Sequence, residues 1–132
     1  MKLEQVKTNP DPYEPYLLSQ AIRAGQLLFV SGQAAYGEDG GIVGKGDFAR
    51  QADQAFRNLE RALKAGGSGM DRVVKVTIFL TSMDHFSTIV EMRRKWFAKP
   101  YPADTIVEIS ALYSPDAMIE IEAIALAVEG EQ

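Results

Sequence analysis

Apolar residues recur along this chain with two periods, one typical of strands and the other of helices. Residues 73–80 are rich in β-branched side chains and form the strongest strand pattern in the sequence. A second apolar run, residues 27–33, ends in serine, glycine and glutamine and is typical of a buried strand. Weaker alternation predicts a short first strand at residues 2–8 and two closing strands, at 105–112 and 117–127.

Two other segments carry apolar residues at helical spacing. The first begins after Asp47, a good N-cap residue, and ends at the glycine pair 66–67. The second is expected from about residue 84 to residue 98, where two nearby prolines end it. The apolar stripe of this second helix is formed by Phe86, Ile89, Val90 and Phe97.

The order of these elements predicts one domain that spans residues 1–132, with neither a repeat nor a linker. A sheet with two helices on one face is a two-layer α+β domain. One layer of helices covers only one sheet face, yet several of the strands are apolar on both faces. We therefore expect the open face to be buried against other copies of the chain, which predicts a homo-oligomer.

Composition narrows the classes of partner. The 132 residues are 46% hydrophobic and 24% charged, which is ordinary for a soluble globular protein. The net charge of −4 argues against a nucleic-acid partner, and the basic run 93–95 reads as a solvated helix face. The apolar runs are far shorter than the ~20 residues of a membrane span, and the first residues lack the apolar core of a signal peptide. We expect a cytoplasmic protein that binds neither nucleic acid nor membrane.

The sequence gives no support for metal or cofactor chemistry. The single histidine, His85, cannot form a metal site alone, and the absence of cysteine excludes thiolate sites and a cysteine nucleophile. The five glycines between residues 37 and 46 do not form a phosphate-binding fingerprint. We therefore expect neither a metal nor an organic cofactor.

Two pairs of residues are candidates for chemistry. Glu120 and Glu122 lie two apart on a predicted strand, so both point to the same sheet face. That arrangement fits either a solvated face or a general acid–base pair. Ser31 and Gly32 follow a buried strand and offer a hydroxyl beside an approachable backbone, suited to holding a small anion or a carbonyl. They equally fit a turn or bulge that ends the strand.

Four segments resemble, in the same order, the reactive intermediate deaminase family, also called Rid or YjgF. They are residues 19–33, 51–59, 73–86 and 119–125. The resemblance implies a chorismate-mutase-like α+β fold, with a mixed six-stranded sheet and two helices on one face. It also implies a homotrimer with a small-molecule cleft at each subunit interface.

Deaminating members of that family hydrolyse short-lived 2-imino or enamine acids to keto acids and ammonia. By resemblance, Ser31 and Gly32 line the cleft, and Phe86 contributes to it from a neighbouring subunit. Glu120 is expected to position the attacking water or to relay its proton, which is a general acid–base role.

Three positions depart from the family pattern. Asp104 stands where the family carries an arginine that grips a substrate carboxylate, so that planar, bidentate donor is lost. Leu18 occupies the position of a cleft tyrosine, counted back along the first segment, and Ile106 stands where many members have cysteine. Arg23 and Arg93 are the candidates to compensate for the missing arginine.

Asp104 leaves two interpretations open. If Asp104 and Glu120 face one cleft, their repulsion keeps one of them protonated, and the cleft suits a neutral or cationic ligand. Otherwise Asp104 turns outward or caps the backbone of Thr105, and the cleft is a remnant.

Two functions follow from these alternatives. The first is a divergent hydrolase that acts on a C=N or related bond with water held by Glu120. The second is a non-catalytic trimer that binds a small ligand or a partner. A ribonuclease is disfavoured by the acidic balance and the lack of a basic, aromatic surface.

Overall fold

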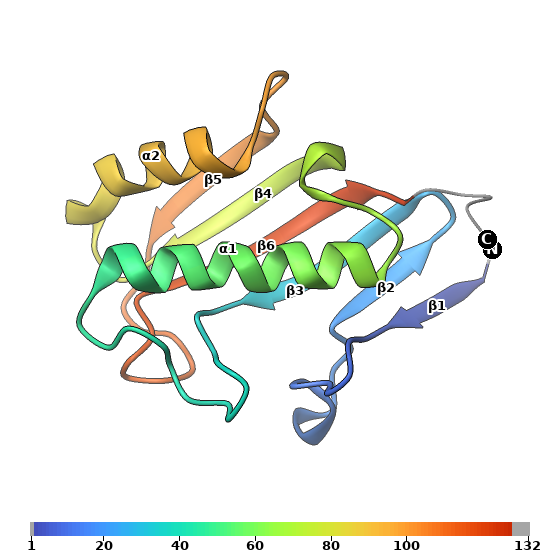
Figure 1. The fold of residues 1–132 in the computed structure, drawn as a ribbon, viewed down its shortest axis with the longest axis horizontal. Helices are drawn as coiled ribbons and strands as arrows, with labels where there is room; N and C mark the ends of the chain where they lie inside the picture. Colours follow the sequence, from blue (N-terminus) through green and yellow to red (C-terminus); the bar gives the residue numbers. More distant parts are fainter. Residues whose placement is uncertain (1, 128–132) are drawn as a thin grey trace.

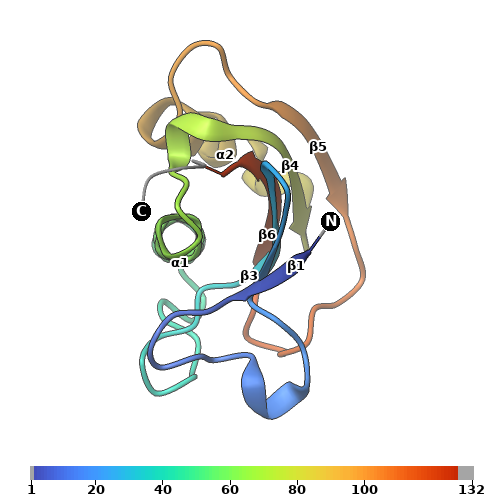
Figure 2. The ribbon, with the colours of Figure 1, turned by 90° about the vertical axis from the view of Figure 1, so that its right-hand side faces the viewer.

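The computed structural model describes residues 2–127, which form a mixed six-stranded sheet with both helices on one side (Figures 1 and 2). The order of strands across the sheet is β1-β2-β3-β6-β4-β5. This arrangement confirms the predicted two-layer α+β domain. The strands are β1 (Leu3–Val6), β2 (Ala21–Ala24), β3 (Leu27–Gln33), β4 (Val73–Leu80), β5 (Ala103–Glu108) and β6 (Ile119–Leu126).

The last strand, β6, lies in the middle of the sheet, where it pairs antiparallel with both β3 and β4. The pairs β1–β2 and β2–β3 are also antiparallel. Strands β4 and β5 pair in parallel, and α2 forms the crossover between them. The end of β3 and the start of β6 are therefore neighbours, although the sequence separates them by about 90 residues, which loop-closure entropy makes costly.

The helices begin and end close to the predicted residues. Helix α1 (Phe48–Ala65) is capped by Asp47, whose side chain accepts a hydrogen bond from the backbone N–H of Arg50 at 3.2 Å. Helix α2 (Phe86–Trp96) is shorter than expected, because the residues before it form a 3₁₀ turn, η3 (Met83–His85). The His85 ring in that turn stacks on Phe48, with ring centroids 4.1 Å apart.

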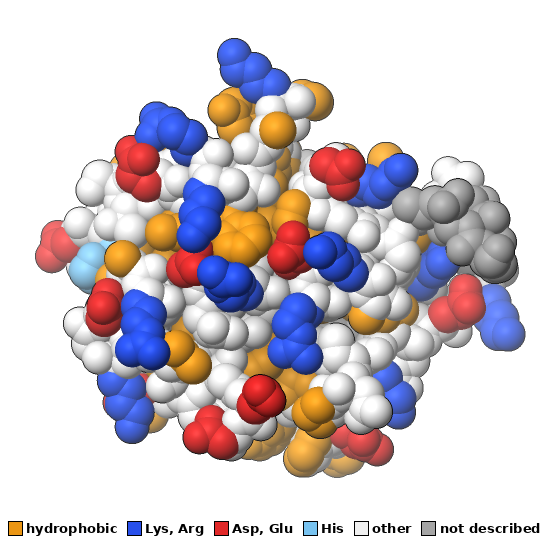
Figure 3. Space-filling model, viewed as in Figure 1, with side chains coloured by type: hydrophobic (Ala, Val, Ile, Leu, Met, Phe, Trp, Pro, Cys, Tyr) orange, Lys and Arg blue, Asp and Glu red, His pale blue; other side chains and the backbone are white. Residues whose placement is uncertain are grey.

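The main core lies between the helices and the sheet. On α1 it contains Phe56, Leu59 and Leu63, which are fully buried, as is Leu28 on β3. The helix-covered side of the molecule presents basic and acidic side chains interspersed over its surface (Figure 3). No helix within residues 2–127 is long and apolar enough to cross a membrane.

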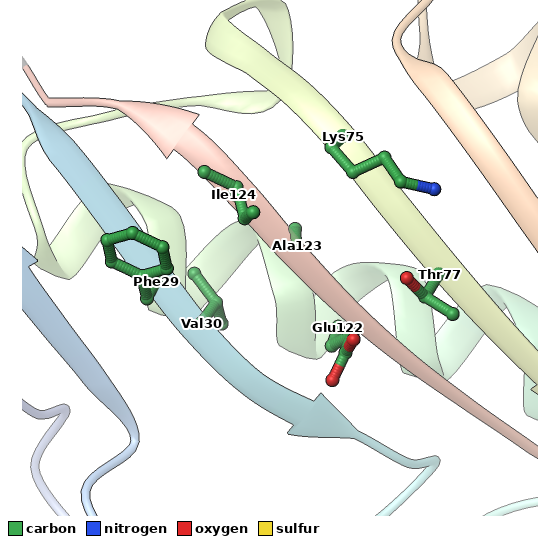
Figure 4. A pocket seen from close by; sticks show the side chains of 7 residues that line it. All are labelled: Phe29, Val30, Lys75, Thr77, Glu122, Ala123 and Ile124. Atoms are coloured by element: carbon green, nitrogen blue, oxygen red, sulfur yellow. The ribbon is translucent and has the colours of Figure 1, made fainter.

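The opposite sheet face is not covered by any element of the described chain (Figure 2). Phe29 on β3 and Leu126 on β6 point from it and are 42% and 44% exposed. Phe29 pairs across the strands with Ile124 on one wall of a shallow hollow of about 190 Å³ (Figure 4). This face therefore exposes large apolar side chains to solvent in the single chain.

Two details differ from the sequence predictions. The strand expected at residues 105–112 begins earlier and ends earlier, as Ala103–Glu108. Phe86, expected on the apolar stripe of the second helix, is 43% exposed, whereas Ile89 of the same stripe is fully buried. Phe86 is the first residue of α2, so its ring lies at the end of the core rather than inside it.

Candidate functional site

Strand β3 ends in a bulge at Ser31 and Gly32, where its register with β6 shifts between Val30 and Gln33. The Ser31 N–H donates to the Gln20 carbonyl at 2.9 Å, and the Ser31 hydroxyl donates to the Ser19 carbonyl at 2.6 Å. A hydroxyl that donates its hydrogen keeps its lone pairs as acceptors. The Ser31 oxygen can therefore accept a hydrogen bond from a ligand N–H or O–H.

Glu120 on β6 lies directly against Gly32. A Cβ added to Gly32 would lie 2.1 Å from Oε2 of Glu120, so the carboxylate occupies the space of the missing side chain. Burial raises the pKa of Glu120, and the neighbouring charge of Glu122 raises it further. Among the hydrogen bonds of residues 2–127, none reaches this carboxylate. The result is a carboxyl group suited to taking up and releasing a proton.

Two tyrosine hydroxyls stabilise the bulge by hydrogen bonds. The Tyr13 hydroxyl donates to the Gly32 carbonyl at 2.6 Å, and the Tyr36 hydroxyl donates to Oε1 of Gln33 at 2.6 Å. Their rings meet edge to face, with centroids 5.9 Å apart. Burial raises the pKa of Tyr13, and Tyr36 and Glu120 raise it further. Tyr13 is therefore a neutral donor that fixes the backbone beneath Glu120.

The segments before β2 and before β6 expose further aromatic and aliphatic side chains. Burial raises the pKa of Tyr113, and the Glu120 carboxylate raises it further. Tyr16, Tyr113 and Leu18 are 74%, 64% and 42% exposed. Leu18 thus lies half-exposed after a 3₁₀ turn, η1 (Glu14–Tyr16), and a left-handed Leu17 with φ 63°.

Asp104 lies elsewhere, in an ion pair with Arg93 of α2. The Arg93 Nε donates to Oδ2 of Asp104 at 3.0 Å, and Nη2 donates to Oδ1 at 3.1 Å. The two side chains are only 25% and 17% exposed. Asp104 therefore neither turns outward nor caps Thr105, because its carboxylate is occupied by a bidentate guanidinium.

Phe86 and Ile106 complete this second cluster. The Arg93 guanidinium carbon lies 5.6 Å from the centroid of the Phe86 ring. Ile106 lies two residues after Asp104 on β5 and packs on the edge of the core. Asp104, Arg93, Phe86 and Ile106 thus gather where α2 meets the edge strand.

The two clusters lie on opposite faces of the sheet. Asp104 is in register with Val76, a core residue beneath the helices, whereas Glu120 is flanked on β6 by the core residues Ile119 and Ile121 and so points to the uncovered face. Within one chain the two carboxylates therefore do not share a cleft. The raised pKa of Glu120 has burial and Glu122 as its causes, without Asp104.

Comparison with known proteins agrees with the fold and with the resemblance of the four segments. The endoribonuclease L-PSP family matches residues 6–127. The chain belongs to this family. Among its relatives is RutC family protein PH0854 from Pyrococcus horikoshii, 40% identical over 116 residues, which are 88% of this chain and 90% of that protein. The human 2-iminobutanoate/2-iminopropanoate deaminase is 33% identical over 117 residues, which are 89% of this chain and 83% of that enzyme.

Two solved structures superpose closely on this chain. The crystal structure of the yeast protein YEO7 has a TM-score of 0.89 at 34% identity and covers 96% of this chain and all of its own. YyfA from Yersinia pestis, described as a protein of unknown function of the conserved Rid family, has a TM-score of 0.88 at 32% identity, with 96% and 100% coverage. These relatives confirm the expected Rid fold.

Sequence reasoning missed Tyr13 and its role in this L-PSP fold. Tyr13 stands in a proline-rich segment, residues 9–15, which was interpreted only as irregular structure. Its hydrogen bond reaches Gly32, 19 residues away, and no local pattern encodes such a contact. The described residues also contain no group of three or more His, Asp or Glu side chains that could hold a metal ion.

Proposed function

We propose that the chain is a hydrolase that converts imine or enamine metabolites to carbonyl compounds and ammonia, with Glu120 as general base. The observation that carries this proposal is the Glu120 carboxylate, which has a raised pKa, lacks a hydrogen-bond partner among the described residues and lies against Gly32. Relatives whose names specify deamination of 2-imino acids support the reaction class.

The chemistry needs a base, a water and an acceptor for the substrate nitrogen. Glu120 removes a proton from water, and the resulting hydroxide adds to the carbon of the C=N bond while the protonated Glu120 gives that proton to the nitrogen. The carbinolamine then passes its hydroxyl hydrogen to the Glu120 carboxylate, which delivers this second proton to the nitrogen as the C–N bond breaks, so ammonia leaves and a C=O bond forms. The lone pairs of Ser31 accept a hydrogen bond from the substrate N–H throughout.

The cleft is completed, in this proposal, by a second copy of the chain in a homotrimer. Glu120 and the Asp104 cluster lie on opposite faces of one sheet, so a single chain cannot bring them together. The uncovered face exposes Leu126 as well as Phe29, which Figure 4 shows beside Ile124, and such a face favours a chain–chain contact. Sedimentation is expected to give a trimer, and a stable monomer at micromolar concentration would refute this part.

Hydrolysis of 2-iminobutyrate, generated in place by an amino acid oxidase, tests the reaction. Because Asp104 replaces the carboxylate-binding arginine, we expect wild type to release the keto acid only slowly from 2-iminobutyrate and faster from neutral imines, and Glu120→Ala to lower each rate by about 10²–10⁴-fold, the usual share of a general base. Glu38→Ala is the matched control, because it removes an exposed carboxylate from the glycine-rich loop, away from the proposed base, and is expected to keep most of the activity.

A wild type that fails on every imine would contradict the proposal. That result would instead support the second function, a trimer that binds a small ligand without catalysis. The presence of Asp104 in place of a carboxylate-binding arginine makes a panel of substrates necessary, since a slow reaction with 2-iminobutyrate alone reports on recognition as well as on chemistry.

A further inference from the structure

The basic run at residues 93–95 does not act as one patch. Arg94 pairs with Glu91 on the solvent side of α2, and Lys95 pairs with Asp53 of α1. Only Arg93 turns toward β5, where Asp104 accepts two of its hydrogen bonds. Arg93 is therefore set apart from its neighbours by direction, by burial and by partner.

The guanidinium of Arg93 keeps donors to spare. Arginine has five N–H donors, and Asp104 takes one from Nε and one from Nη2. Both hydrogens of Nη1 and the second hydrogen of Nη2 make no hydrogen bond to any described residue. The side chain is still 25% exposed, so a ligand can reach these donors.

The charge of this guanidinium is already balanced. A ligand carboxylate that approached the free N–H groups would also approach the carboxylate of Asp104, and the two like charges would repel. A neutral carbonyl oxygen accepts the same hydrogen bonds without that repulsion. The ion pair is thus a donor site that carries no net charge.

Phe86 adds a surface for a flat group. It lies seven residues before Arg93 on α2, which places both side chains on one helix face, and the guanidinium lies 5.6 Å from its ring centroid. The ring is 43% exposed. A planar amide can rest on this ring while its oxygen meets the guanidinium.

We propose that Arg93, held in place by Asp104, is the specificity-determining residue of the cleft and selects a neutral amide or ketone carbonyl over a carboxylate. The substrate class is then 2-imino amides and related neutral imines rather than 2-imino acids. This inference rests on the proposed function, because it joins the Arg93 cluster of one copy to Glu120 of another.

Binding of two stable product analogues tests this choice without any turnover. Wild type, titrated by calorimetry with 2-oxobutyramide and with 2-oxobutyrate, is expected to bind the amide at least about tenfold more tightly, the effect of 1.4 kcal/mol. Asp104→Asn removes the competing charge and is expected to reverse the preference. Arg93→Met is expected to lower the affinity for the amide by a similar factor. Arg93→Lys keeps the positive charge but not the planar set of donors, and it is expected to weaken amide binding as well.

Arg94→Met is the matched control, since it removes a guanidinium one residue away that pairs only at the surface, and it keeps the wild-type preference. Two results would overturn the inference. One is tighter binding of the carboxylate than of the amide by wild type, and the other is a preference for the amide that changes in neither Arg93→Met nor Asp104→Asn. Thermal unfolding checks that each variant is folded. If Arg93→Met does not fold, Arg93→Lys still tests the role of the guanidinium donors.

Hydrolysis separates this inference from the proposed function. The imines of 2-aminobutyrate and 2-aminobutyramide can be formed from their N-chloro derivatives by loss of HCl and followed with Glu120→Gln as the inactive reference. Hydrolysis that depends on Glu120 but favours the acid over the amide overturns the assignment of Arg93 alone. The predicted binding preference without hydrolysis that depends on Glu120 overturns the proposed function alone.

Discussion

Glu120 and Asp104 are two partly buried carboxylates in one small domain, and their surroundings are opposite. Glu120 has no hydrogen-bond partner among the described residues, lies against Gly32, and has a pKa raised by burial and by Glu122. Asp104 has a bidentate guanidinium at 3.0 and 3.1 Å. The unpaired carboxylate is destabilised when charged and is thereby ready to take a proton, whereas the paired one is satisfied and instead orders its partner.

Glu120 and Asp104 are also fixed in place by different kinds of contact. The bulge beneath Glu120 is fixed by hydrogen bonds from Tyr13 and from Gln33, whose amide donates to the Ser31 carbonyl at 2.9 Å. Asp104 has no bulge beneath it, because it lies on a regular strand that pairs with β4, and its side chain contacts Arg93 of α2. Side-chain hydrogen bonds therefore fix the backbone beneath Glu120, whereas strand pairing and one ion pair place Asp104.

The largest effect is expected from Gly32→Ala, which removes the space that Glu120 occupies. The added Cβ would lie 2.1 Å from Oε2, so the carboxylate must move by more than an ångström, a shift of the kind that lowers rates by about 10²-fold. The strain is expected to lower the free energy of unfolding by about 1–3 kcal/mol. Imine hydrolysis and urea unfolding measure the two effects.

Gly41→Ala is the matched control for that variant. An added Cβ there would lie 3.4 Å from Oδ1 of Asp39, an ordinary contact, so both activity and stability should stay near wild type. Equal losses of activity and stability in Gly32→Ala and Gly41→Ala would show that the glycines provide backbone flexibility, and that Gly32 does not provide space for Glu120.

Arg93→Met is expected to destabilise the fold by about 1–3 kcal/mol, because it leaves the Asp104 carboxylate partly buried without its partner. The double variant Arg93→Met/Asp104→Ala should recover most of this loss, since it removes the orphaned charge as well. A double-mutant cycle of urea unfolding at fixed protein concentration measures the coupling. Additive losses would mean that the ion pair contributes nothing of its own.

Tyr13→Phe is expected to cost about 0.5–1.5 kcal/mol, the usual share of one hydrogen bond, because the Gly32 carbonyl loses its phenolic donor. The rate of imine hydrolysis should fall as well, since the bulge carries Glu120. Tyr101→Phe, at an exposed tyrosine, serves as the comparison and should change neither quantity. If Tyr13→Phe had the same stability and the same rate of hydrolysis as Tyr101→Phe, the Tyr13 hydroxyl would not be the group that stabilises the bulge.

The smallest effect is a dependence of stability on pH in Glu120→Gln. Burial keeps the folded-state pKa of Glu120 above its ordinary value of 4.5. Well below pH 4.5 the carboxyl is neutral in both the folded and the unfolded state, and no penalty exists. As the pH rises through the folded-state pKa, the folded chain loses stability relative to the unfolded one.

Glu120→Gln should therefore be more stable than wild type at neutral pH, and this difference should vanish in acid. Thermal unfolding across the pH range at fixed protein concentration is the measurement. A difference that is constant from acid to neutral pH would mean that Glu120 has no raised pKa in the folded protein.

Most of the fold could be predicted from local patterns. The N-cap at Asp47 and the apolar period after it defined α1, and β-branched runs defined the central strands, because short-range sterics and burial determine both. The end of β5 at Glu108 was missed, since residues 109–112 continue the apolar alternation although their pairing with β4 stops. Strand ends depend on partners, and partners are not local.

The candidate site divides in the same way. Ser31, Gly32 and Glu120 were identified because the resemblance carries them in unbroken segments, and the structure brings these three together. Arg93 was named as a candidate without a position, because a contact between a helix and a strand 11 residues later depends on the crossover geometry. The resulting neutral pair also replaces the repulsive carboxylate that the sequence suggested at residue 104.

The central position of β6 has a consequence for how the molecule is made. Until β6 is synthesised, β3 and β4 each present an unpaired strand edge to the cell, which is a hazard for aggregation. Glu120 enters with that same strand, after Gly32 and Ser31 are already in the chain. A nascent or truncated chain that lacks residues 119–126 therefore has neither the strand that joins β3 to β4 nor the carboxylate that lies against Gly32.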